Sequence, residues 1–186
     1  MLFRSFETIR TQLGDLPIIA EDLGDLSPKV PLLLDHVGFP GMRVLTFAFS
    51  SDESDSFLPH NYPIEAIAYT GTHDNDTTLG WWKAAPDTER EFAASYLALD
   101  RSDPVKGFLE ALWESRAMVA IAPLQDLLRL DSSARMNIPG TTDANWRWRA
   151  THDHITDERI PAQLNDLICR YRRAPGSQTS RRKSHP

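Results

Sequence analysis

The stretch AIAYTGTHDND, residues 66–76, carries the pattern on which the fold prediction rests. An apolar run typical of a buried strand leads directly into polar and acidic side chains, among them His73 and Asp74. The same pattern occurs in PIIAEDLG, residues 17–24, where the apolar run ends at Glu21 and Asp22. Since reacting groups converge at the carboxyl ends of parallel strands in α/β barrels, the two acidic segments are predicted to meet there.

Alternating strands and helices are predicted outward from these two stretches. The predicted strands cover residues 17–20, 43–49, 64–70 and 118–122. The predicted helices cover residues 2–13, 28–37, 88–99, 104–113, 123–130 and 157–172. Strands that alternate with helices indicate an α/β fold with a parallel sheet, and four strand–helix units amount to half of an eight-unit (β/α)8 TIM barrel.

The chain is predicted to form one structural unit over residues 1–173, followed by a Ser-, Arg- and Pro-rich basic tail over residues 174–186 that we expect to be disordered. Its formal net charge of -6 gives no support for a nucleic-acid surface. The single Cys169 excludes an internal disulfide framework and a Cys-rich zinc site. No apolar run is long enough to span a membrane and no signal peptide is recognisable, so a cytoplasmic location is expected.

Two carboxyl groups that converge at one site suggest chemistry on glycosidic bonds, which needs an acid to protonate and charge to stabilise the transition state. Other interpretations of the same residues stay open. Glu21 could be a helix cap or a surface acid, and Asp22 could support it or cap the turn with Gly24. His73 and Asp74 could belong to a turn. A metal-binding His–Asp pair is set aside, because the other histidines show no ligand spacing.

Six motifs resemble one family of enzymes. They lie at residues 18–24, 38–45, 47–49, 58–62, 69–82 and 135–142, in the family's order. On these residues the chain resembles the 4-alpha-glucanotransferases, also called amylomaltases or disproportionating enzymes, of the alpha-amylase superfamily. The resemblance extends from the first predicted helix to about Arg172, so only the tail is outside it.

The resemblance implies a retaining enzyme that moves alpha-1,4-glucan segments between malto-oligosaccharides, with glucose among its substrates and with no cofactor or metal. Glu21 falls on the family's general acid/base, and Asp74 on the carboxylate that stabilises the transition state. His73 falls on a neighbour that binds a sugar hydroxyl. Substrate contacts are implied for three further positions, Asp22, Asn75 and Asn137.

One part of the family's catalytic machinery is not found in this sequence. The family's nucleophile is an aspartate in an Arg-x-Asp-His motif on the fourth barrel strand, and these 186 residues contain no such motif. The predicted strands fit the fifth to eighth of the barrel. We therefore expect the chain to be the C-terminal half of the catalytic barrel and to be inactive and poorly stable alone, with the N-terminal half as a partner.

Two alternatives to glucan transfer follow from the same sequence. The first is an alpha-glucan hydrolase of the same superfamily, which would give only shorter products. The second is a catalytically dead remnant that binds carbohydrate or a partner protein, a reading that the missing nucleophile favours.

Overall fold

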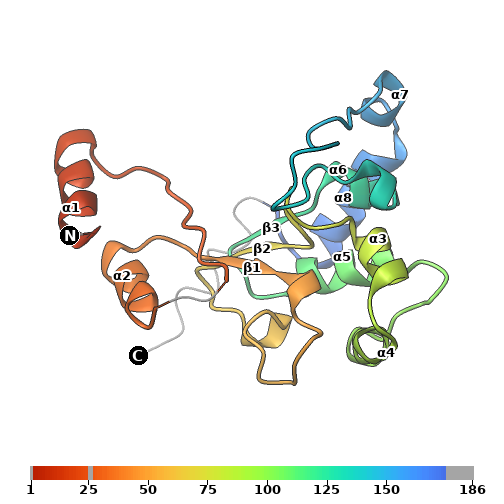
Figure 1. The fold of residues 1–186 in the computed structure, drawn as a ribbon, viewed down its shortest axis with the longest axis horizontal. Helices are drawn as coiled ribbons and strands as arrows, with labels where there is room; N and C mark the ends of the chain where they lie inside the picture. Colours follow the sequence, from red (N-terminus) through yellow and green to blue (C-terminus); the bar gives the residue numbers. More distant parts are fainter. Residues whose placement is uncertain (1, 25–26, 175–186) are drawn as a thin grey trace.

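The computed structural model describes residues 2–24 and 27–174. Its centre is a three-stranded parallel sheet with the strand order β1-β2-β3 (Figure 1). The strands are β1 Met42–Val44, β2 Ile67–Tyr69 and β3 Val119–Ile121. Strand order follows chain order, so every connection is a crossover to a neighbouring parallel strand, as in βαβ units.

Helices surround this small sheet. They are α1 Leu2–Leu13, α2 Lys29–Val37, α3 Thr78–Ala84, α4 Asp87–Tyr96, α5 Pro104–Glu114, α6 Leu124–Leu127, α7 His152–Ile155 and α8 Arg159–Arg170. Short 3-10 turns are η1 Leu45–Phe47, η2 Pro59–Asn61 and η3 Ser132–Ala134. In Figure 1, α1 and α2 form an arm to the left of the sheet, whereas α3 to α8 lie to its right. Within the arm, the rings of Phe6 and Phe39 meet edge to face with centroids 5.2 Å apart.

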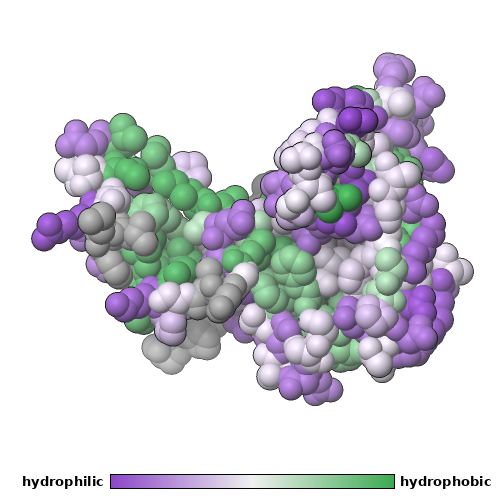
Figure 2. Space-filling view, viewed as in Figure 1, coloured by the Kyte–Doolittle hydropathy of each residue, from purple (hydrophilic) through white to green (hydrophobic). Residues whose placement is uncertain are grey.

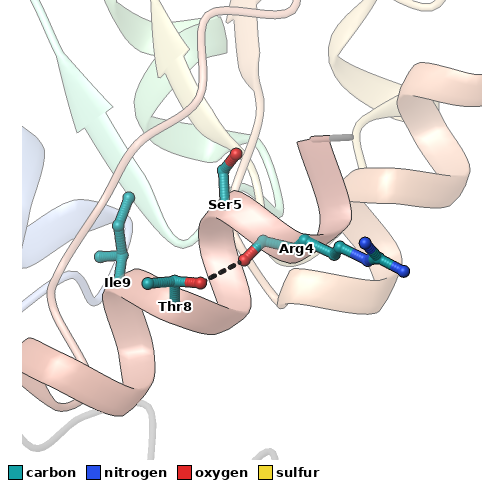
Figure 3. A pocket seen from close by; sticks show the side chains of 4 residues that line it. All are labelled: Arg4, Ser5, Thr8 and Ile9. Carbon is teal, nitrogen blue, oxygen red and sulfur yellow. Dashed lines mark hydrogen bonds between the residues drawn. The ribbon is translucent and has the colours of Figure 1, made fainter.

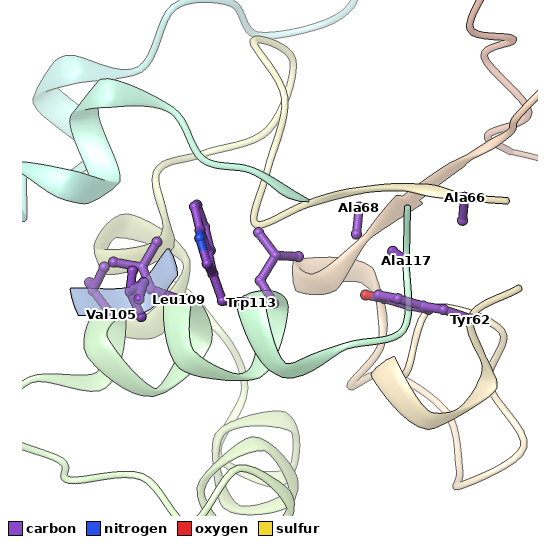
Figure 4. Close-up of a cluster of buried hydrophobic side chains, with 9 residues drawn as sticks. Tyr62, Ala66, Ala68, Val105, Leu109, Trp113 and Ala117 are labelled. Atoms are coloured by element: carbon purple, nitrogen blue, oxygen red, sulfur yellow. The ribbon is translucent and has the colours of Figure 1, made fainter. Parts of the chain in front are cut away.

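The main core lies between the sheet and α5. Ala66 and Ala68, at β2, are buried against Leu109 and Trp113 of α5 (Figure 4). Alanine side chains on the strand allow the helix to approach the sheet closely, and Leu167 of α8 closes the cluster. A second cluster surrounds the buried Phe49, and its other members include side chains of α3, α4 and α5.

Apolar side chains also remain on the surface of the arm. Leu13, Leu16, Ile19 and Leu32 are all exposed on α1, on α2 or between them, where Figure 2 shows a green surface. The outer side of the opposite part of the molecule is mostly polar. Other exposed apolar side chains, such as Ile64 and Ile155, lie outside the arm.

The structure corrects several of the predicted elements. The prediction of a strand at residues 17–20 is wrong, because this segment is irregular. Ile18 N donates to Leu16 O at 3.0 Å instead of to a neighbouring strand. Only Ala20 N reaches across, to Pro40 O at 2.9 Å. The described residues therefore contain three of the four predicted strands.

The remaining strands are confirmed in place but are shorter than predicted. The strand predicted at 43–49 is β1 followed by the turn η1, and the helix predicted at 123–130 is only the single turn α6. Helices α3 and α7 were not predicted at all. Apart from Ala174, the predicted disordered tail lies outside the described residues.

Candidate active site

A cavity of about 880 Å³ opens at the carboxyl end of the sheet. Tyr69 at the end of β2 and Ile121 at the end of β3 form part of its wall. Four of the predicted site residues line this one cavity: Glu21, His73, Asp74 and Asn75. The two acidic segments therefore meet where the strand pattern predicted, although the first of them is not a strand.

Asp74 is held by a loop distant in sequence. Its Oδ1 accepts a hydrogen bond from Asn137 Nδ2 at 2.6 Å and lies 3.2 Å from His73 Nε2. The backbone N–H of Asn137 also donates to His73 O at 3.0 Å. The Asp74 side chain remains 45% exposed, so the carboxylate is oriented but still accessible from the cavity.

Arg135 joins the same two loops through their backbones. Its Nη2 donates to Asp74 O at 2.7 Å, and its Nε donates to Asn137 O at 2.8 Å. Both bonds go from the guanidinium to neutral backbone carbonyl oxygens, and neither engages the Asp74 side chain. Arg135 was not predicted as a site residue; its place at the start of the last motif, two positions before Asn137, was the available signal.

Asn75 lines the cavity and also closes the turn that carries His73 and Asp74. Its Oδ1 accepts from Thr72 N at 2.8 Å and from Thr72 Oγ1 at 2.9 Å. Thr72 Oγ1 also accepts a bond from Asp74 N at 3.3 Å. The turn that the sequence predicted for this stretch is therefore present, and it orients the Asp74 side chain.

A buried carboxylate, Asp126, braces both ends of this loop. It is 1% exposed and accepts hydrogen bonds from Thr70 Oγ1 at 2.5 Å, from Thr78 N at 2.7 Å and from Thr78 Oγ1 at 2.8 Å. Thr70 follows β2 and Thr78 begins α3, so the loop between them is fixed at both sides. Burial raises the pKa of Asp126 above its usual value. No local sequence pattern had indicated this role for Asp126.

Glu21 and Asp22 are adjacent but have different surroundings. Glu21 is exposed and lines the cavity, whereas Asp22 is not among the cavity-lining residues. Asp22 accepts from Met42 N at 2.5 Å and from Arg43 Nη1 at 3.0 Å, which ties this segment to the start of β1. A Cβ atom added at Gly41 would lie 2.3 Å from Asp22 Oδ2, so a larger residue there would displace the Asp22 carboxylate from this position.

A second hollow lies against α1, and the side chains that line it include no carboxyl or imidazole group. Arg4, Ser5, Thr8 and Ile9 of this one helix line it, and Thr8 Oγ1 is bonded to Arg4 O at 2.8 Å (Figure 3). Across residues 2–24 and 27–174, no three His, Cys, Asp or Glu side chains cluster to form a metal site. No helix in this part of the chain has the length and apolar character needed to cross a bilayer.

Comparison with known proteins identifies the family of this chain. A family model described as 4-alpha-glucanotransferase matches residues 2–155. The chain belongs to the 4-alpha-glucanotransferase family. The resemblance inferred from the six sequence motifs is thereby confirmed.

Curated members of the 4-alpha-glucanotransferase family are similar along most of this chain. The enzyme of Thermus thermophilus is 44% identical over 162 residues, which are 82% of this chain and 32% of that protein. The enzyme of Streptococcus pneumoniae is 42% identical over 173 residues, 92% of this chain and 34% of that protein. A potato relative, named as chloroplastic/amyloplastic, is 40% identical over 90% of this chain and 30% of its own length.

A solved member of the family has the same fold. The amylomaltase from Streptococcus agalactiae, in complex with acarbose, matches with a TM-score of 0.84 and 36% identity over 90% of this chain and 34% of that one. The chain thus spans about a third of the length of the 4-alpha-glucanotransferases that it matches. Its small parallel sheet is consistent with part of a barrel.

Proposed function

We propose that residues 1–173 form the C-terminal half of the catalytic (β/α)8 barrel of a retaining 4-alpha-glucanotransferase, with β1, β2 and β3 among its strands 5 to 8. The substrates are malto-oligosaccharides, longer alpha-1,4-glucans and glucose as acceptor. The observation that carries this proposal is that Glu21 and Asp74 line one cavity at the carboxyl end of the parallel sheet. The membership of the chain in the family supports it.

In this proposal Asp74 stabilises the transition state. Breaking a glycosidic bond places positive charge on the sugar ring, which resembles an oxocarbenium ion, and a fixed carboxylate beside the ring lowers the energy of that state. The bond from Asn137 fixes the position of the carboxylate without neutralising it, because the donor is an uncharged amide. His73, at the same oxygen of Asp74, is placed to bind a sugar hydroxyl.

Glu21 acts as the general acid and base. In the first step its proton passes to the glycosidic oxygen of the leaving glucan, while the nucleophile forms a bond to the anomeric carbon. In the second step the carboxylate takes the proton from an acceptor hydroxyl, whose oxygen displaces the nucleophile. The nucleophilic aspartate of an Arg-x-Asp-His motif does not occur in these 186 residues, so it must come from a segment outside them.

A chimaeric enzyme tests the proposal. Residues 2–174 replace the matching segment of the Thermus thermophilus 4-alpha-glucanotransferase, and the product is incubated with maltotriose and resolved by chain length. A ladder of longer sugars with released glucose supports the proposal, and it should disappear in the Glu21→Gln chimaera. Shorter products alone would indicate a hydrolase. A folded chimaera without products would overturn the roles of Glu21 and Asp74.

The isolated chain serves as the second arm of this experiment. We expect no products from it, because the covalent step lacks its nucleophile. A ladder made by the isolated chain would show that a nucleophile is present within it. Saturable glucan binding by a chain whose folded chimaera remains inactive would support the alternative of a carbohydrate-binding remnant, which the absent Arg-x-Asp-His motif favours. A cytoplasmic location stays a prediction.

A further inference from the structure

We propose that Trp146 forms a stacking platform for one glucose ring of an alpha-glucan at the rim of the cavity. The inference rests on the proposed function and adds a binding residue to it. The ring centroids of Trp146 and His73 lie 5.1 Å apart, with 34° between the ring planes. His73 lines the cavity, and Trp146 is 51% exposed. The indole thus extends the cavity wall beyond His73.

The backbone at Trp146 is strained. Its φ angle is 60°, in the left-handed region that bulky residues rarely adopt. Two hydrogen bonds hold it there: Trp146 N donates to Met136 O at 2.6 Å, and Arg149 Nη1 donates to Trp146 O at 2.6 Å. Such strain persists where the surroundings impose it, and it concentrates at ligand-binding and active sites.

The loop before Trp146 is ordered without help from the indole. Asn145 Oδ1 accepts from Ile138 N at 2.9 Å, and Asn145 Nδ2 donates to the Thr141 carbonyl and hydroxyl oxygens, each at 3.0 Å. These bonds close the loop through its polar groups. These polar contacts do not involve the indole, which contacts the His73 ring and remains half exposed to a ligand.

Other aromatic residues line the cavity itself, namely Phe47, Tyr69 and Trp81, whereas Trp146 lies next to the lining, against His73. Trp148 is less exposed and stacks on His154 with 17° between the planes and centroids 6.1 Å apart. Trp81 packs into the cluster around Phe49. Trp146 combines exposure, a strained backbone and contact with a cavity-lining residue.

A pyranose ring fits this surface chemically. The C–H groups on one face of a glucose ring carry partial positive charge, and the face of an indole carries the negative part of its quadrupole. The hydroxyl groups at the ring's edge need polar partners, which His73, in contact with the indole, and Asp74, which lines the same cavity as His73, can supply. A glucose unit at this position would therefore combine apolar stacking with hydrogen bonds.

Binding of maltoheptaose to the full chain tests the proposal, with the dissociation constant measured by ligand-observed NMR. Trp146→Gly and Trp146→Ala should raise the Kd roughly 3- to 10-fold, and Trp146→Phe should raise it less because an aromatic face remains. The matched control Trp148→Phe should bind as the wild type does. Since glycine adopts a φ of 60° without strain, Trp146→Gly should keep or raise the unfolding midpoint.

An unchanged Kd in both Trp146→Gly and Trp146→Ala would show that the indole does not bind the glucan, and it overturns the platform. It is also overturned if Trp146→Phe binds no better than Trp146→Gly, or if the wild-type chain does not bind maltoheptaose. The chimaera separates this failure from that of the proposed function: a maltotriose ladder whose KM is the same in the wild type and in Trp146→Gly overturns the platform and leaves the proposed function intact.

Discussion

Asn137 donates a hydrogen bond of 2.6 Å from Nδ2 to Oδ1 of Asp74, across 63 positions of sequence. His73 Nε2 lies 3.2 Å from the same oxygen, so both contacts fall on one side of the carboxylate. The arrangement leaves Oδ2 as the oxygen that can meet a sugar hydroxyl. Asn137 is therefore placed to position Asp74, whatever contact it also makes with substrate.

Replacement of Asn137 should lower catalysis more than stability. In the chimaera, Asn137→Ala removes a charge-assisted hydrogen bond, which corresponds to a fall in kcat of about 10- to 100-fold. Asn137→Asp should lower kcat further, since it places a second negative charge against Asp74. Steady-state kinetics with maltotriose measure both, and Asn165→Ala on α8 is the matched control. Wild-type kcat in Asn137→Ala would contradict this positioning.

If Glu21 is the general acid, the loss of activity on its replacement should depend on the leaving group of the donor. With maltotriose, Glu21→Gln should lower kcat by roughly 10²- to 10⁴-fold, because the leaving oxygen is no longer protonated. With an alpha-maltosyl fluoride donor, the first step should survive, since fluoride leaves without a proton. A rapid burst of fluoride measured in single-turnover experiments would show this. Equal losses with both donors would contradict the acid role; Glu65→Gln, an exposed glutamate before β2, is the control.

Substitutions at Asp22 and Gly41 should have non-additive effects on the free energy of unfolding. Asp22→Ala removes the acceptor of Met42 N and Arg43 and should lower the free energy of unfolding by about 1.5–3 kcal/mol. Gly41→Ala should also destabilise the wild type, because its Cβ would lie 2.3 Å from Asp22 Oδ2. In the Asp22→Ala background that clash is removed. Urea unfolding of the four variants should give a clear interaction energy, whereas additive losses would contradict the coupling.

Asp126 should make stability depend on pH in a defined direction. Its pKa is raised above 3.8 in the folded state, so the folded chain binds this proton more tightly than the unfolded chain does. Between pH 3.8 and the folded pKa, this group makes stability fall as pH rises.

The comparison of the wild type with Asp126→Asn isolates this effect, because asparagine does not titrate. The stability of the wild type relative to the variant should decline as pH rises from 3.8, as measured by denaturant unfolding over a pH series. A difference that does not change with pH would contradict the raised pKa of Asp126.

The sequence predicts the bounds of α1, α2 and α5 better than it predicts the strands, since the predicted strand at residues 17–20 is irregular and the other strands are shorter than predicted. Apolar runs located β1, β2 and β3, although Val119 and Ile121 of β3 are exposed in this structure. The segment TTLGWWKA, residues 77–84, contains few strong helix formers, and α3 was missed. It is helical because Thr77 caps it by accepting from Gly80 N at 3.0 Å and because Asp126, distant in sequence, binds its first residue.

The site residues that follow apolar runs could be predicted from the sequence. The hydrogen bonds between residues distant in sequence could not. The convergence of Glu21 and Asp74 followed from two apolar runs that end in acids. The bond between Asp22 and Arg43 and the bracing by Asp126 depend on tertiary contacts that no local pattern contains. The same holds for Arg135, whose two bonds are to backbone oxygens and are therefore independent of the partner's side chain.

The strand order β1-β2-β3 has a consequence for synthesis of the chain. Parallel strands cannot form from a hairpin, so each pairing must wait for its crossover. The crossover from β1 to β2 spans residues 45–66, whereas that from β2 to β3 spans 70–118 and includes α3, α4 and α5. During translation, β1 and β2 can pair while β3 is still within the ribosome, and the last strand is added to an edge that already exists.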